Sequence, residues 1–193
     1  FMSMNWAVDV LKQEKASDRI NFETIYYMYS NNDVEALSKT EVADEEKELR
    51  SGVKWVSFKQ KFFSYALISK DNFNDAFVEL HTKSRPSNSR YQKSMSTIID
   101  IPFDGLNEDN KIEMSYYFGP NSFKVMKQYD LGLEEQIPLG GKLISWINKY
   151  IVINVFNWLG HYGWSYGVVI LLLTLIIKIC LRPIAFKSYM PTA

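Results

Sequence analysis

The sequence contains a single cysteine, Cys180, and only two histidines among its 193 residues. One cysteine cannot form an internal disulfide, so a folded domain must be held together by its own hydrophobic core. Aromatic residues, which make up 15% of the chain, can supply that core. Charge of one sign is also lacking, because 22 Lys and Arg balance 22 Asp and Glu. This balance argues against direct recognition of nucleic acid.

Glycine-rich nucleotide-binding motifs are absent as well. The chain has neither a Gly-x-x-x-x-Gly-Lys run nor the Gly-x-Gly-x-x-Gly pattern of dinucleotide-binding folds. The sequence therefore predicts no nucleotide site, and we expect neither a bound cofactor nor a metal.

One long apolar stretch, Tyr166–Leu181, dominates the C-terminal part of the sequence. As a helix it would rise about 24 Å, slightly less than the roughly 30 Å hydrocarbon core of a bilayer. Trp164 precedes it as an aromatic anchor, and Arg182 follows it as a cation that can reach the headgroups. A buried core helix usually keeps a polar face, whereas Leu and Ile surround this one. The stretch predicts a transmembrane helix over 164–182.

Three residues interrupt the apolar surface of this helix: Gly167, Thr174 and Lys178. At about 100° per residue they fall within about 40° of one another, so they share one stripe. A charge in a span usually faces a bundle interior or a water-filled cavity. Alternatively, Lys178 snorkels to the headgroups near Arg182. The spacing alone favours neither reading.

The charges around the apolar stretch indicate its orientation. Basic residues follow it, and residues 159–165 before it carry no charge. The positive-inside bias places the segment 183–193 in the cytoplasm and everything before the span outside. Residues 1–5 show no basic region or apolar run of a signal peptide, so we expect a further segment to precede them.

Residues 1–118 read as successive β-strands. β-branched and aromatic residues recur in short runs separated by turn-forming residues. Residues 44–48, which are charged, are expected to form a loop or helical turn, and residues 69–75 to separate two strands. In the run that begins at Val53, we expect Val53, Trp55 and, after an irregularity in the alternation, Phe58 to point inward. Short strands without intervening helices predict a large antiparallel sandwich. The expected strands cover residues 2–10, 24–29, 53–60, 62–68, 76–81, 95–101 and 111–118.

The periodicity becomes helical after Gly119-Pro120. Residues 119–141 are predicted to be a helical linker, with a helix that begins at Asn121 or Ser122 and ends at Tyr129.

Residues 142–160 form a second helical run that is aromatic, cationic and less apolar than a span. These features favour a helix that lies in the headgroup region, with Lys142, Lys149, Trp146 and Trp158 at the membrane interface together with Trp164. A core helix packed on the sandwich is the alternative.

Several segments resemble one protein family. They are Val53-Lys-Trp-Val-Ser-Phe-Lys-Gln-Lys-Phe-Phe, Tyr116-Tyr-Phe-Gly-Pro, Tyr129-Asp-Leu-Gly-Leu and Val155-Phe-Asn-Trp-Leu, followed by Tyr166–Leu181 and Pro183-Ile-Ala-Phe-Lys-Ser-Tyr-Met. In this order they resemble the YidC/Oxa/Alb family of membrane protein insertases, over about residues 6–190.

The resemblance implies a β-supersandwich of galactose-mutarotase type, here without its N-terminal part, then an interfacial helix and the first of five core transmembrane helices. In that family a basic residue five positions before a proline lies in a hydrophilic groove that receives nascent membrane proteins. Lys178 stands five positions before Pro183, and Thr174 and Gly167 match groove positions. Lys departs from the commoner Arg, because its compact charge lacks the bidentate fork. Only one core helix is present in the sequence.

The resemblance also implies partners and a location. The partners are nascent membrane proteins, the Sec translocon (SecYEG and SecDF), the lipid bilayer, and a ribosome that binds cytoplasmic parts missing from this sequence. The location is the bacterial inner membrane, with the sandwich in the periplasm and a multi-pass full-length protein.

Two other classes compete with an insertase. Mutarotase-like sandwiches can act on sugars, but that chemistry generally needs histidines with a carboxylate in a cleft. His161 belongs to the expected interface, and we expect His81 on the surface at a strand end, so an enzyme is disfavoured. The second class is a single-span periplasmic adaptor that binds a partner through the edge Tyr26–Tyr29, although aromatic strand residues are more often core.

Overall fold

The structure is a computed structural model, and its chain divides into two compact units. The first unit spans Phe1–Ile137 and the second Pro138–Ala193. The residues described are 2–12, 23–37, 44–73, 76–86, 88–102, 112–140 and 142–189.

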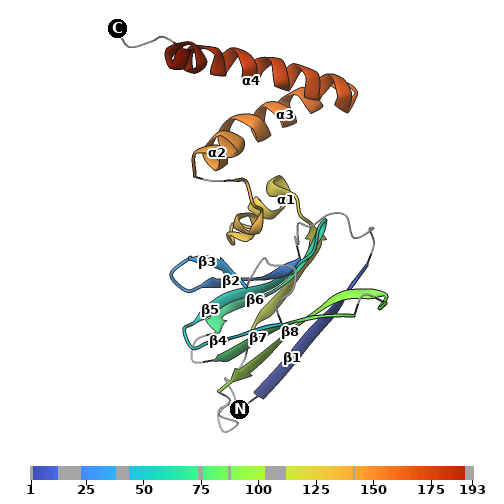
Figure 1. The fold of residues 1–193 in the computed structure, drawn as a ribbon. Helices are drawn as coiled ribbons and strands as arrows, with labels where there is room; N and C mark the ends of the chain where they lie inside the picture. The colour runs from blue at the N-terminus through green and yellow to red at the C-terminus, as the bar shows by residue number, and fades with distance from the viewer. Residues whose placement is uncertain are drawn as a thin grey trace. The chain divides into compact units, whose positions relative to one another are not determined.

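A four-stranded antiparallel sheet forms one layer of the first unit (Figure 1). Alternate residues of its strands are buried, as in β8, where Met95 and Ile99 point inward and Ser96 and Ile98 do not. This period of two reflects a sheet with one face on the core and one toward solvent. In spatial order the strands are β1 (Met2–Leu11), β8 (Tyr91–Ile101), β7 (Phe77–Ser84) and β4 (Glu45–Leu49).

A five-stranded antiparallel sheet forms the other layer, and its central strands are buried on both faces. Five of the six residues in β2 and six of the seven in β5 are buried, so the alternation seen in β8 is lost. In spatial order the strands are β3 (Val34–Ala36), β2 (Thr24–Tyr29), β5 (Val53–Lys59), β6 (Phe63–Phe73) and β9 (Met114–Pro120).

The inner core lies between the two sheets. Its aromatic centre is Phe58, whose ring stacks on that of Trp6 with centroids 4.4 Å apart. Burial of such side chains is the main source of stability in a domain without disulfides. The buried members are Val10, Ile25, Tyr27, Leu37, Leu49, Val53, Val56, Phe58, Leu67, Phe73, Ala76, Val78, Leu80, Met95, Ile99 and Ile101.

A second cluster covers the outer face of the five-stranded sheet. Here Met126 of α1 (Phe123–Lys127) and Leu133 of η1 (Leu133–Gln136), a short 3-10 helix, are fully buried among residues of the sheet. The indole nitrogen of Trp55 donates a hydrogen bond to the carbonyl oxygen of Leu131 at 2.8 Å. The segment that follows β9 therefore packs on the sheet as part of the first unit.

Buried polar groups fix the position of this segment. The hydroxyl of Ser57 donates to Oε1 of Gln136 at 2.9 Å. The single hydrogen of the Ser64 hydroxyl is shared between Oδ1 of Asn121 at 2.6 Å and Oε1 of Gln136 at 3.3 Å. Nδ2 of Asn121 donates in turn to the carbonyl oxygen of Gln60 at 2.6 Å. Because these groups are largely withdrawn from water, a shift of the segment would leave several of them unpaired.

The structure confirms the coarse fold predicted from the sequence. The protein is mainly β, with two antiparallel sheets followed by helices. The finer assignment to a galactose-mutarotase-like supersandwich and the expected domain boundaries stay predictions.

Three local predictions are wrong. Residues 44–48 were expected to form a loop or turn, but β4 lies there because it pairs with β7, with Leu49 opposite Val78 in the core. Residues 69–75 were expected to separate strands, but β6 continues to Phe73. Trp55 was expected on the same face as Val53 and Phe58, yet it lies in the outer cluster, because the register shifts between Val53 and Trp55.

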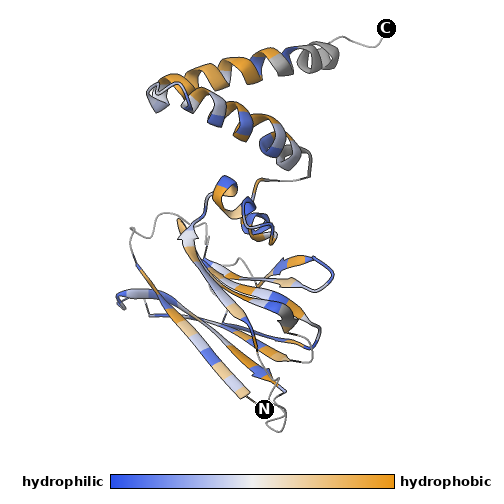
Figure 2. Cartoon of the chain, turned by 180° about the vertical axis from the view of Figure 1, so that it is seen from behind, coloured by the Kyte–Doolittle hydropathy of each residue, from blue (hydrophilic) through white to orange (hydrophobic). Residues whose placement is uncertain are grey.

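The second unit consists of a helical hairpin. Its first arm joins α2 (Lys142–Ile147), a π-helical turn η2 (Asn148–Val152) and α3 (Ile153–Gly160). The second arm is α4 (Tyr166–Tyr189), which is hydrophobic along most of its described length (Figure 2). Gly163, with φ of 69°, provides the left-handed turn between the arms.

We expect Gly132→Ala to destabilise the first unit by about 1–2 kcal/mol. Gly132 has φ of 67°, and an added Cβ would lie 2.3 Å from Cε of Met28. Urea unfolding monitored by Trp fluorescence measures the effect. In a Met28→Ala background the clash disappears, so the cost of Gly132→Ala should fall to that of the left-handed backbone alone. An equal cost in both backgrounds would show that the contact with Met28 is irrelevant.

Candidate functional site

The three residues predicted to line a groove lie on one helix, α4, and all three are exposed. An added Cβ at Gly167 would meet nothing within 4 Å. The hydroxyl of Thr174 donates to the carbonyl oxygen of Ile170 at 2.8 Å, which satisfies it within the helix. Lys178, one turn further along, presents its charge from the same stripe. Their role in a groove stays a prediction.

The opposite side of α4 packs against α3. Val169 of α4 and Leu159 of α3 are both buried. Phe156 and Tyr166 stack with ring centroids 6.3 Å apart. Packing on α3 thus leaves the side that carries Thr174 and Lys178 exposed.

The expectation of a membrane span over 164–182 is not confirmed. In the part of the chain that the structure describes, no helix is both long enough and apolar enough to cross a membrane.

The predicted interface residues fall on the helical unit, where the aromatic ones are exposed. Trp146, Trp158 and Trp164 are 57, 58 and 49% exposed. Lys149 is half-buried, and the side chain of Lys142 lies outside the described residues. Trp and Tyr combine an apolar body with a polar tip, which suits a water–lipid boundary. Their placement at a membrane stays a prediction.

The two units differ in net charge, although the charges of the whole chain balance. Residues 138–193 carry five basic residues and no Asp or Glu. The first 137 residues therefore hold 17 Lys and Arg against 22 Asp and Glu. This asymmetry can be read from the sequence, but the net charge of zero conceals it. A uniformly basic unit is attracted to anionic surfaces.

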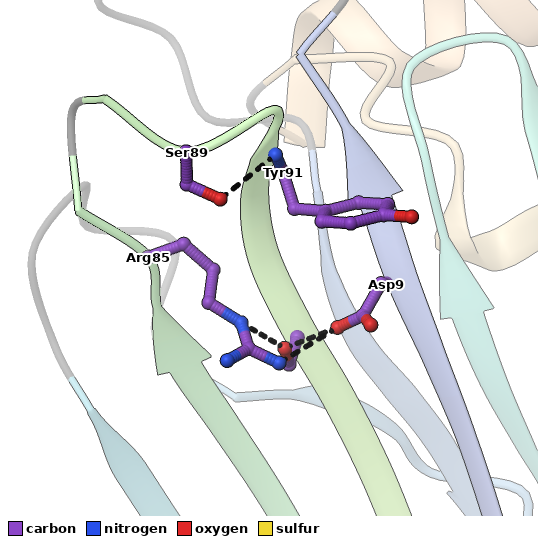
Figure 3. Close-up of polar contacts among 5 residues, drawn as sticks. Asp9, Arg85, Ser89 and Tyr91 are labelled. Atoms are coloured by element: carbon purple, nitrogen blue, oxygen red, sulfur yellow. Dashed lines mark hydrogen bonds and ion pairs between the residues drawn. The ribbon is translucent and has the colours of Figure 1, made fainter.

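On the sandwich, a polar cluster joins β1, β8 and the end of β7 (Figure 3). The guanidinium of Arg85 donates to the carboxylate of Asp9 at 3.1 Å and to the hydroxyl of Ser94 at 2.7 Å, and Ser94 donates to Asp9. These bonds, first that from Ser94 and then that from Arg85, lower the pKa of Asp9. The three side chains hydrogen-bond to one another, so the cluster has a structural role in holding neighbouring strands together.

A second polar cluster bridges the two sheets. The hydroxyl of Tyr27 on β2 donates to Glu35 on β3 at 2.7 Å, and Lys47 on β4 donates to the same carboxylate at 3.0 Å. The pKa of Glu35 is lowered, chiefly by the hydrogen bond from Tyr27, while burial raises the pKa of Tyr27. The contacts tie the open edges of the two sheets together, which is a structural role.

Lysine is buried at two described positions, Lys59 and Lys93, and the sequence analysis anticipated neither. Lys93 on β8 is only 2% exposed, and its ammonium donates to the carbonyl oxygen of Glu23 at 3.1 Å. Desolvation lowers its pKa. Its position on the inward side of an alternating strand was the available signal.

Among the described residues, only Glu46, Glu79 and His81 form a group that could hold a metal ion. Their ligand atoms lie within 4.8 Å of one another on the solvent face of β4 and β7. The imidazole of His81 already contacts both carboxylates, at 3.8 and 3.2 Å. His81 lies within β7 and is half-buried, rather than at the strand end as expected.

The edge Tyr26–Tyr29, which the adaptor alternative would use to bind a partner, is not a free surface. β2 lies between β3 and β5, and Tyr26, Tyr27 and Met28 are buried. The structure confirms the favoured expectation that these residues are core, because Tyr27 packs in the inner core and Tyr26 and Met28 pack in the outer cluster.

Comparison with known proteins gives consistent matches. Residues 2–153 match the family described as YidC periplasmic domain. The chain is 36% identical over 203 residues to the membrane protein insertase YidC of Parabacteroides distasonis, covering 100% of this chain and 31% of that protein. It is 35% identical over 200 residues to that of Bacteroides fragilis, covering 100% and 32%. For that of Amoebophilus asiaticus the identity is 30% over 173 residues, covering 90% and 29%. The chain spans about a third of the length of these curated relatives.

We expect Asp9→Asn to reduce stability at pH 7 by at most about 1 kcal/mol, since Asp9 is 44% exposed and water screens its contacts. A lowered folded-state pKa stabilises the fold above the unfolded value of about 3.9, and that contribution disappears as pH falls through the folded value. Unfolding at pH 7 and pH 3 should therefore show a larger difference at pH 7 than at pH 3. Glu48→Gln, which removes the exposed pair with Arg50, serves as a control with almost no expected effect.

Proposed function

Because this chain belongs to the YidC family, we propose that it is part of a membrane protein insertase of the bacterial inner membrane, with the sandwich in the periplasm. The observation that carries the proposal is the similarity to YidC proteins along the whole chain, together with the match of residues 2–153 to their periplasmic domain. The candidate groove residues lie beyond residue 153, so their role depends on the relatives and on the chemistry of the helix.

We propose that the segment 164–182 lies in the membrane and contributes Gly167, Thr174 and Lys178 to a hydrophilic groove. What supports this is the apolar run Tyr166–Leu181 and the exposure of all three residues on α4. A cation in a partly wet, low-dielectric groove lowers the free-energy cost of moving acidic and polar residues of a nascent protein across the membrane. Thr174, one turn before Lys178, supplies a hydroxyl, and Gly167, three turns before Lys178, leaves space further along the same stripe.

The energy for insertion would come from burial of the client's own apolar segment. When a client segment moves from the wet groove into lipid, its apolar surface is removed from water. This burial is favourable and drives the step without nucleotide. Accordingly, we propose a non-enzymatic role without a cofactor. The Sec translocon (SecYEG and SecDF), and a ribosome acting through parts outside this chain, are the proposed partners besides nascent membrane proteins.

We propose further that the first arm of the hairpin lies at the membrane interface. Trp146, Trp158 and Trp164 would occupy the headgroup region, with Lys142 and Lys149 beside anionic lipid. The exposure of the three indole rings supports this arrangement.

Replacement of Lys178 tests the groove. In the full-length protein, Lys178→Leu should abolish or severely slow growth of cells depleted of their own insertase, because the groove would lose the charge of Lys178. Lys178→Arg should grow normally, since it keeps the charge. Immunoblotting controls for protein level. Normal growth with Lys178→Leu at normal levels would exclude the groove role of Lys178 and favour the single-span adaptor.

A further inference from the structure

The exposed face of the first arm consists of uncharged, mostly aromatic residues. Trp146, Tyr150, Asn154 and Trp158 are exposed and lie four positions apart. The residues between Trp146 and Asn154, apart from Tyr150, are half-buried. The rings of Trp146 and Tyr150 are tilted against each other with centroids 5.8 Å apart, so neighbouring members of the face touch.

A regular α-helix could not keep these residues on one face. Residues four apart drift by about 40° each time, so Trp158 would point about 120° away from Trp146. The π turn η2, Asn148–Val152, lies between them. A π turn closes its hydrogen bonds from i to i+5 and accommodates about one extra residue. The extra residue therefore reduces the angle between Trp146 and Trp158 about the helix axis by about 100°, from about 120° to about 20°.

Contacts on the other sides of the arm fix this rotation. Phe156 and Leu159 pack toward α4, opposite the exposed face. At the start of the arm, Nδ2 of Asn148 donates to the carbonyl oxygen of Leu139 at 2.9 Å. After the π turn, Nδ2 of Asn154 donates to the carbonyl oxygen of Tyr150 at 2.8 Å. Both ends of the π turn are thus held.

The charge of the first arm indicates what this face meets. The arm, residues 142–160, carries two basic residues, Lys142 and Lys149, and no acidic one, so it complements an anionic surface. Indole and phenol rings that are exposed together, without charged neighbours on the same stripe, are typical of the headgroup region of a bilayer.

We propose that the π turn keeps Trp146, Tyr150 and Trp158 in register as a single face that docks on the headgroup region of an anionic phospholipid bilayer. The proposal rests on the interfacial role given to this arm above. It adds that the π turn is the feature that directs the three aromatic side chains toward the same membrane surface.

A one-residue deletion and a one-residue insertion distinguish the direction of Trp158 from the length of the arm. Deletion of Ile151 removes the extra residue, so a regular α-helix forms with Trp158 eleven positions after Trp146, again about 20° away. Insertion of one Ala between Ile153 and Asn154 rotates Trp158 by about 100°. In the insertion chain, the exchange of Asn157→Trp with Trp158→Asn returns an indole to the original direction. Circular dichroism verifies that each variant keeps its helix content.

The measurement is quenching of Trp fluorescence by lipids brominated near the headgroups. The chain is reconstituted in vesicles of phosphatidylethanolamine and phosphatidylglycerol, and the contribution of Trp158 is the difference from Trp158→Phe. We expect the deletion to keep this contribution within about twofold, the insertion to lower it to less than about a third, and the exchange to restore it. Phosphatidylcholine vesicles, which lack anionic lipid, should give weaker quenching.

The outcomes distinguish this proposal from the one it rests on. Quenching of Trp158 in the parent chain that survives the insertion would overturn the register proposal alone. No quenching of Trp158 or Trp146 in the parent chain would overturn the interfacial role itself, as would chemical crosslinking of the chain into dimers through this face. Equal quenching with phosphatidylcholine alone would remove the preference for anionic lipid. None of these results depends on the growth test of Lys178.

Discussion

The sandwich depends on a sheet that must be covered on both sides. The five-stranded sheet presents Phe58 to the four-stranded sheet on one face and Trp55 to the segment after β9 on the other. Neither face is polar enough to be left in water. The hydrogen bonds from Ser57 and Ser64 to Gln136 tie the outer cover in place, so the helical segment belongs to the fold of the sandwich rather than to a loose connection.

The sequence predicted the strands in which apolar and polar residues alternate clearly or aromatic residues are frequent. It missed β4, which forms because it pairs with a neighbouring strand. β4 contains four charged residues, and its identity comes from β7 beside it, which no local pattern reveals. Trp55 was assigned to the wrong face because a register irregularity reverses the alternation after Val53. Tertiary contacts override local preference at both places.

For the candidate site, the helical stripe of Gly167, Thr174 and Lys178 followed from spacing, because one helix is enough to define which residues share a direction. What the stripe faces is a property of neighbouring elements, so its role came from the family resemblance. The π turn could not be read from the sequence either. Its residues, Asn148–Val152, are compatible with an ordinary helix, and only the exposed spacing of Trp146 and Trp158 shows the extra residue.

The two-sided sheet also sets an order of events during synthesis. The strand β1 pairs with β8 far along the chain, with Met2 opposite Ile101. The last buried residues of the outer cover, Leu133 and Gln136, come later still. Until they emerge, the sheet exposes an apolar face, and such surfaces are prone to aggregate. Completion of the sandwich is therefore delayed until the chain has grown to the boundary of the helical unit.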